Sequence, residues 1–114
     1  MTLVSVVESP LYLARAEGLI SEAEREQVID ILAADPTAGV RIKGLNGFRK
    51  MRIPLRGRGK RGGGRVVYWF RSTDYPAVLM LLFAKSAAAD LSGEDRKRLA
   101  AIGTRLMAQF GAEE

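Results

Sequence analysis

The sequence predicts a mixed α+β fold in which the elements follow the order β-α-α-β-β-β-α. Three patterns support this prediction. Apolar and basic residues alternate along residues 48–55, which is typical of a half-buried strand, and residues 78–83 are continuously apolar, which is typical of a central strand. Helix-start signals occur near residues 9, 21 and 92. With 114 residues and neither repeats nor a linker, the chain is expected to form a single domain over residues 1–114.

A short strand and a first helix are predicted at the N-terminus. Residues 3–7 are rich in β-branched side chains, which favour a strand. Ser9 offers an N-cap and Pro10 stands at the first helical position, so a helix is expected over residues 11–16.

Two further helices have comparable start signals. Ser21 and Glu24 have the spacing of a capping box, and the helix that they begin should end before Pro36, because the residue before a proline avoids helical geometry. Ser92 and Asp95 begin the last helix in the same way. Its predicted apolar face holds Leu99, Ile102, Leu106 and Phe110.

Three strands are predicted between these helices, over residues 48–55, 65–71 and 78–83. The glycine-rich segment 57–64 joins the first two. It matches the G-x-G-x-x-G pattern, but a strand follows it rather than the helix that a dinucleotide site requires. A basic hairpin loop is therefore expected there.

The distribution of charge predicts a polyanionic partner, most plausibly a nucleic acid. Residues 41–71 hold 11 of the chain's 18 basic residues and no acidic residue, whereas the rest of the chain carries all 13 acidic residues. Such a concentration of positive charge attracts phosphate groups.

Composition excludes several classes of chemistry and of partner. The chain has no Cys and no His, so a metal site would need carboxylates alone, and no acidic cluster accompanies the basic stretch. We therefore expect neither a metal nor a cofactor. The N-terminus lacks a basic leader region, and the longest apolar run, residues 77–84, is too short to cross a bilayer. A soluble, cytoplasmic protein without a membrane partner is expected.

The basic strands suggest either phosphate binding or RNA cleavage. Lys50 and Arg52 lie two residues apart, so they share one face of their strand at a spacing of about 7 Å. Arg65 begins the partner strand and Lys85 follows the last one, while Trp69 could stack on a base. In a cleavage reaction, a lysine made neutral by nearby positive charges would act as the base, and arginines would stabilise the transition state. These residues alone leave both functions open.

Four segments, in this order, resemble the HigB branch of the RelE/ParE toxins. The segments are Gly47-Phe48-Arg49-Lys50-Met51-Arg52, then Gly57 to Tyr68, then Phe83-Ala84-Lys85, then Asp90-Leu91-Ser92. The resemblance implies a small antiparallel sheet flanked by helices, as in RelE. It also implies a type II toxin that cuts translated mRNA on the ribosome without a metal, and a cognate antitoxin of the helix-turn-helix, HigA-like kind.

The resemblance also implies roles for individual residues. The catalytic residues carried over by position are Lys50, Arg52, Arg65 and Lys85, with Lys50 as the general base. The implied RNA-binding residues are Arg49, Arg56, Arg58, Lys60, Arg61 and Trp69. Simple packing in the sheet is the ordinary expectation for Tyr68, Trp69 and Phe83, and phosphate steering is the expectation for Arg41, Lys43, Arg56, Arg58 and Arg71.

Two other functions remain open. A ParE-like toxin of the same fold would poison DNA gyrase without cutting RNA. A non-catalytic RNA-binding module would hold the phosphate backbone and do no chemistry. The constellation around Lys50, Arg52 and Arg65 favours cleavage over gyrase inhibition, because gyrase inhibition does not chemically require such a cluster.

Overall fold

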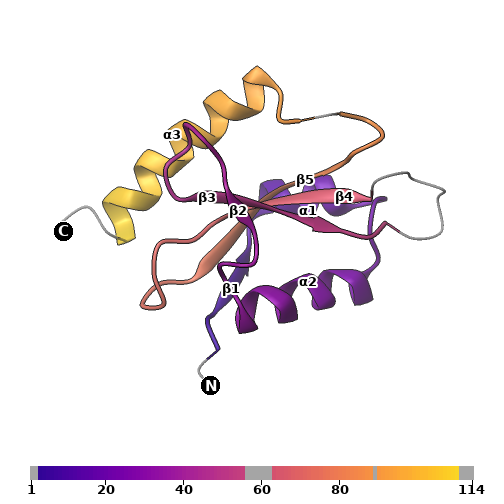
Figure 1. Cartoon of the computed structure of the whole chain (residues 1–114), viewed down its shortest axis with the longest axis horizontal. Coiled ribbons are helices and arrows are strands. Elements are labelled where there is room, and N and C mark those ends of the chain that lie inside the picture. Colours follow the sequence, from indigo (N-terminus) through magenta and orange to yellow (C-terminus); the bar gives the residue numbers. More distant parts are fainter. Residues whose placement is uncertain (1–2, 56–62, 89, 111–114) are drawn as a thin grey trace.

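The computed structural model describes residues 3–55, 63–88 and 90–110, and within them it contains a five-stranded sheet and three helices (Figure 1). The predicted α+β class is confirmed. The elements are β1 (Val6–Glu8), α1 (Pro10–Ala16), α2 (Glu22–Ala34), β2 (Val40–Arg41), β3 (Phe48–Ile53), β4 (Gly64–Trp69), β5 (Ala77–Ala84) and α3 (Gly93–Phe110).

The strands are arranged in the order β1-β5-β4-β3-β2. The apolar strand β5 therefore has a neighbour on each side, as its sequence predicted. Three of the four strand pairs are antiparallel, but β1 runs parallel to β5. The first strand occupies Val6–Glu8 rather than residues 3–7, and the two-residue edge strand β2 was not expected. Nothing in a short segment sets the direction of its pairing, because the partner strand lies far away along the chain.

The helices begin where the sequence predicted, because the side chains of the N-cap residues bond to free backbone N–H groups. Ser9 caps α1. Ser21 accepts a hydrogen bond from the N–H of Glu24, and the Glu24 carboxylate accepts one from the N–H of Ser21, which completes the capping box of α2. The Ser92 hydroxyl accepts a bond from the N–H of Asp95 at the start of α3.

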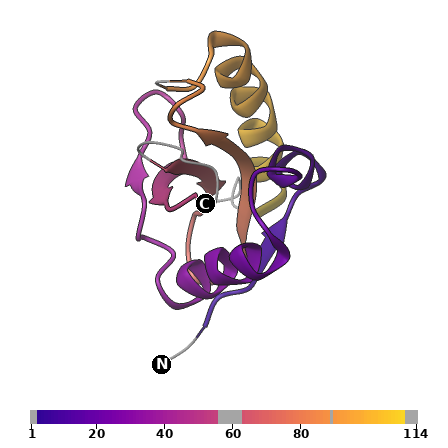
Figure 2. The same ribbon diagram turned by 90° about the vertical axis from the view of Figure 1, so that its right-hand side faces the viewer.

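Two apolar cores lie on opposite faces of the sheet, so that α2 and α3 are separated by the strands (Figures 1 and 2). One core packs α1 and α2 against Tyr68 and Leu79. The other packs α3 against Trp69 and Leu81. No helix within the described residues has both the length and the apolar character needed to span a membrane.

Candidate active site

The four residues predicted to be catalytic lie together around one hollow. Arg52 and Arg65 are direct partners across β3 and β4, and Lys50 projects from the same face of β3. Lys85 follows the end of β5. All four line a cavity of about 470 Å³, together with the half-buried ring of Phe83. We call these four residues the Lys50 cluster.

Backbone pairing explains why β5 brings Lys85 to this place. Arg65 of β4 is paired with Phe83 of β5, so the ends of the two strands coincide. The N–H of Lys85 then donates a hydrogen bond to the carbonyl of Gly63 at 3.0 Å, which holds the residue beside the start of β4. The ends of three adjacent strands thus meet at the cavity.

The electrostatics of the Lys50 cluster favour an anionic ligand. Like charges directly opposite each other on neighbouring strands repel, and Arg52 faces Arg65 in this way. The described lining of the cavity contains no Asp or Glu. A phosphate between these side chains can accept hydrogen bonds from both guanidinium groups.

Asp90 contacts the cluster from outside the cavity lining. Its carboxylate lies 3.2 Å from the Lys50 ammonium and accepts a hydrogen bond from the N–H of Leu91 at 2.7 Å. The Leu91 N–H is the main cause, and Lys50 the next, of the lowered pKa of Asp90. The sequence assigned no role to Asp90, because it stands 40 residues from Lys50 and no local spacing reveals the contact.

Arg49, one of the predicted RNA-binding residues, lies away from the Lys50 cluster. Arg49 is paired with Tyr68 across β3 and β4, so it lies on the opposite face from Lys50, and it donates a hydrogen bond to the carbonyl of Gly39 at 2.7 Å. The predictions for Arg56, Arg58, Lys60 and Arg61 lie outside the described residues.

Trp69 is not available to stack on a base, which corrects the sequence prediction. Its side chain is fully buried beneath α3 and packs against the ring of Phe110, with 6.0 Å between ring centroids. Trp69 does lie on the same side of β4 as Arg65, but α3 covers that part of the face. Phe83 is the aromatic residue among those described that lines the cavity.

Comparison with solved structures supports the architecture, whereas no protein-family model matches the chain. A double arginine-to-alanine mutant of the Escherichia coli toxin RelE in the free state superposes with a TM-score of 0.56. It shares 15% sequence identity over 90% of this chain and 97% of the RelE chain. The chain has a RelE-like fold.

A second crystal structure, of the isolated E. coli RelE toxin, gives a TM-score of 0.51 at 16% identity, over 87% of this chain and 98% of the other. The RelE-like fold therefore extends over nearly the whole chain. At this level of identity the likeness concerns the path of the backbone.

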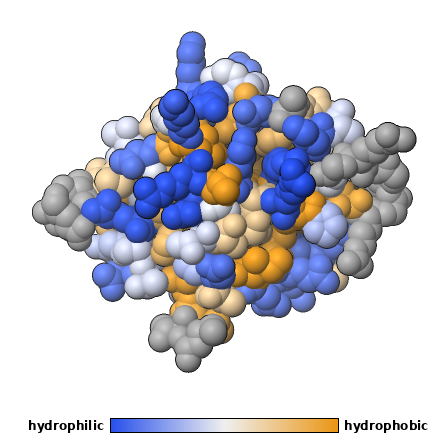
Figure 3. Space-filling model, viewed as in Figure 1, coloured by the Kyte–Doolittle hydropathy of each residue, from blue (hydrophilic) through white to orange (hydrophobic). Residues whose placement is uncertain are grey.

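The arrangement supports two chemical tasks. The two arginines can hold a phosphodiester and stabilise negative charge that develops on it, because a guanidinium group stays protonated and donates paired hydrogen bonds. A lysine ammonium gives up a proton more readily than a guanidinium group, so Lys50 or Lys85 can take part in proton transfer. Figure 3 shows hydrophilic side chains beside apolar ones on the face that carries β2 and β3.

Proposed function

We propose that this protein is a HigB-like toxin of a type II toxin-antitoxin system that cleaves translated mRNA on the ribosome. The observation that carries the proposal is the Lys50 cluster, in which four cations from three adjacent strands surround one cavity. The RelE-like fold is consistent with it. A phosphate between Arg52 and Arg65 accepts hydrogen bonds from both guanidinium groups, as expected of a site that receives RNA.

In the proposed reaction, the 2′-hydroxyl group of the RNA attacks the neighbouring phosphorus atom. Lys50 first gives a proton to water and, as the neutral amine, accepts the proton of that hydroxyl group. The new O2′–P bond forms as the P–O5′ bond breaks, and O5′ takes up a proton from water. Arg52 and Arg65 stabilise the charge on the phosphoryl oxygens, and Lys85 adds positive charge from the end of β5. This chemistry uses side chains alone and needs no metal ion.

Asp90 belongs to this proposal as the resting partner of Lys50. An incoming phosphate competes with the Asp90 carboxylate for the ammonium group, because both are anionic acceptors. The side chains of Lys50 and Asp90 are 32% and 51% exposed, so a phosphate can reach Lys50 and water can solvate the displaced Asp90 carboxylate.

The proposal includes partners and a place of action. The RNA would be cut in the ribosomal A site, in the cytoplasm, and a HigA-like antitoxin with a helix-turn-helix domain would neutralise the protein. These parts rest on the motifs around Lys50, Lys85 and Asp90 and on their order along the chain.

The test is induced expression followed by primer extension on a translated transcript. Cuts within codons are expected for the natural protein and should fall by about 100-fold or more in Lys50→Ala and Arg65→Ala. Lys50→Arg keeps the charge but removes the candidate base, so it should also be inactive. Lys97→Gln removes an exposed cation from α3 and is the matched control, which should cut normally.

Two results would contradict the proposal. Intact mRNA with gyrase-dependent DNA breaks would assign the chain to the ParE-like alternative. Full cleavage by Lys50→Arg would show that Lys50 contributes charge rather than proton transfer. Rescue of growth by the product of the neighbouring gene would identify the antitoxin.

A further inference from the structure

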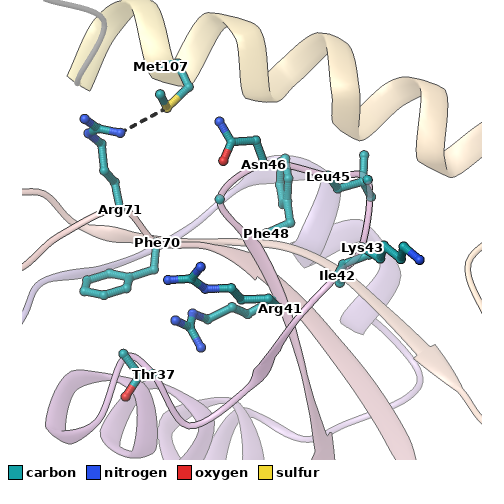
Figure 4. Close-up of a pocket in the computed structure, with 13 residues that line it drawn as sticks. Thr37, Arg41, Ile42, Lys43, Leu45, Asn46, Phe48, Phe70, Arg71 and Met107 are labelled. Carbon is teal, nitrogen blue, oxygen red and sulfur yellow. Dashed lines mark hydrogen bonds between the residues drawn. The ribbon is translucent and has the colours of Figure 1, made fainter. Parts of the chain in front are cut away.

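A second cationic cavity, larger than the first, lies where the loop between β2 and β3 approaches the end of α3. Its volume is about 700 Å³, which is within the range of sites for small organic ligands. Figure 4 shows Arg41, Lys43, Phe70, Arg71 and Met107 around it. The proposed cleavage reaction uses no residue of this cavity, although the sequence predicted RNA binding for Arg49 and phosphate steering for Arg41, Lys43 and Arg71.

The charge of the second cavity is set by the register of β2 and β3. Arg41 and Arg49 are direct partners, so two guanidinium groups extend from opposed positions. Arg71 adds a further cation, and the described lining contains no Asp or Glu. The hydrogen bond from Arg49 to the carbonyl of Gly39 holds that side chain in place while leaving its charge. An anion bound here would offset the repulsion between Arg41 and Arg49.

An aromatic ring lies among these cations. Phe70 follows β4, and its N–H donates a hydrogen bond to the carbonyl of Gly47 at 2.9 Å, which ties it to the loop. Its side chain is half-buried: it packs partly against the core and also lines the cavity. Asn46 is exposed at the same cavity, and its amide can bond to the edge of a base.

We propose that this cavity binds a segment of single-stranded RNA, with phosphates on Arg41 and Arg49 and a base on Phe70. A double helix keeps its bases stacked inside and offers no ring to Phe70. An acidic peptide would satisfy the arginines and leave Phe70 without a stacking partner. The combination of cations and an accessible ring therefore favours an unpaired nucleotide.

The two cavities are close enough for one RNA strand to reach both. Val40 is paired with Lys50, and the next pair along is Arg41 with Arg49, so the cations of the two sites project from adjacent positions on opposite faces. Strand β2 forms the edge of the sheet at which the two faces meet, and its residue Val40 is 64% exposed. A flexible RNA strand can pass over this edge, so the second site would extend the proposed cleavage site. The inference that one strand occupies both sites rests on the proposed cleavage function.

Binding of a 2′-O-methyl RNA oligonucleotide, measured by fluorescence anisotropy, tests the inference without cleavage. A length of about eight nucleotides suits a single-strand site. Arg41→Gln should weaken binding several-fold and make the dependence of log affinity on log salt shallower by about 0.7. Phe70→Leu should weaken binding about 10-fold with the salt dependence unchanged, because stacking releases no counterions. Lys97→Gln should change the affinity less than twofold.

Several results would overturn the inference. One is an effect of Arg41→Gln and Phe70→Leu no larger than that of Lys97→Gln. Another is that a hairpin duplex or a polyglutamate peptide binds more tightly than the single-stranded oligonucleotide, and that this binding is weakened by Arg41→Gln but unchanged by Phe70→Leu. Because Arg41 is exposed, its substitution should leave the fold intact. Phe70 is half-buried, so a thermal unfolding curve is used to check that Phe70→Leu is still folded.

The same experiment separates this inference from the proposed function. If the natural protein leaves mRNA intact while Arg41→Gln and Phe70→Leu still weaken oligonucleotide binding, the cleavage proposal fails and the second site stands. If Lys50→Ala abolishes cleavage while neither Arg41→Gln nor Phe70→Leu changes oligonucleotide binding, the cleavage proposal is supported and the proposal of a second site is wrong.

Discussion

The hydroxyl group of Tyr68 ties the segment before β2 to the centre of the sheet. It accepts a hydrogen bond from the N–H of Gly39 and donates one to the carbonyl of Pro36, each at 2.8 Å. The pKa of Tyr68 is raised above its ordinary value, mainly by burial. Tyr12 is also buried, but its hydroxyl group has no hydrogen-bond partner within the described part of the chain, and burial raises its pKa to about 12.

These two tyrosines make a matched pair for mutagenesis. Tyr68→Phe should lower the free energy of unfolding by about 1–3 kcal/mol, because it removes the hydrogen bonds of the buried Gly39 N–H and the half-buried Pro36 carbonyl. Tyr12→Phe should change it by less than about 1 kcal/mol, since it removes a buried hydroxyl group that makes no bond. Urea denaturation measures both, and equal losses would contradict the role assigned to Tyr68.

The Asp90 carboxylate, which accepts a hydrogen bond from the Leu91 N–H and pairs with Lys50, predicts a dependence of stability on pH. The folded protein holds the pKa of Asp90 below its ordinary value of 3.8, so the contribution of this carboxylate is present above that pH and is lost as the pH falls through the lowered value. Asp90→Asn should therefore destabilise the protein at pH 7, by less than about 1 kcal/mol because the pair is exposed. The difference between variant and parent should vanish in strong acid, and urea titrations across the acid range measure it. A difference that grows toward low pH would contradict this account.

At the scale of the element, the loop between β2 and β3 holds the edge of the sheet against α3. Gly44 and Gly47 both have positive φ angles, of 84° and 87°, which side chains rarely adopt. They differ in their surroundings. Space around Gly44 is open, whereas a methyl group at Gly47 would collide with the indole ring of Trp69.

The two glycines separate backbone strain from crowding. Gly44→Ala should cost about 1 kcal/mol of unfolding free energy from strain alone. Gly47→Ala should cost about 1–3 kcal/mol more, because the buried Trp69 has no room to move. Denaturation followed by far-UV circular dichroism gives both values. Equal costs would mean that the loop yields and that Trp69 is less tightly enclosed than described.

The helices were predictable to within a residue at their starts, because a cap is a local device. Ser9, Ser21 and Ser92 each bond within three residues, so the sequence window that predicts the helix contains the whole interaction. Strand β2 escaped prediction for the opposite reason. Val40 and Arg41 show no periodic pattern, and only their pairing with β3 makes them a strand.

At the scale of the whole molecule, β5 joins the two cores. Its side chains contribute to both faces of the sheet: Leu79 and Leu82 pack with α1 and α2, while Met80 and Leu81 pack on the side of α3. Ion pairs link further elements, Arg15 of α1 with Asp95 of α3 among them, at 3.1 Å. The two layers should therefore unfold together.

Substitutions on the two faces test this cooperativity. Leu32→Ala in α2 and Leu99→Ala in α3 both remove fully buried side chains, and each should cost about 2–5 kcal/mol. Trp69, the only tryptophan, reports on the core beneath α3. Leu32→Ala should shift the fluorescence and circular dichroism curves equally, although it lies on the other face.

Ile31→Ala serves as the control, because its side chain is 46% exposed and its loss should cost less than about 1 kcal/mol. If Leu32→Ala leaves the unfolding curve measured by Trp69 fluorescence unchanged, the two faces of the sheet unfold separately. That result would contradict the prediction of one domain.

The sequence by itself determined which residues could do chemistry and where most elements begin. Alternation along β3 placed Lys50 and Arg52 on one face, and the basic stretch without acids indicated a polyanion, because both signals are local. Only the tertiary structure decided which charges meet. It brought Lys85 to the ends of β3 and β4, set Asp90 beside Lys50, and paired Arg49 with Arg41 of β2. It also buried Trp69, because the packing of α3 onto the sheet depends on contacts between residues far apart in the chain, and no local pattern records them.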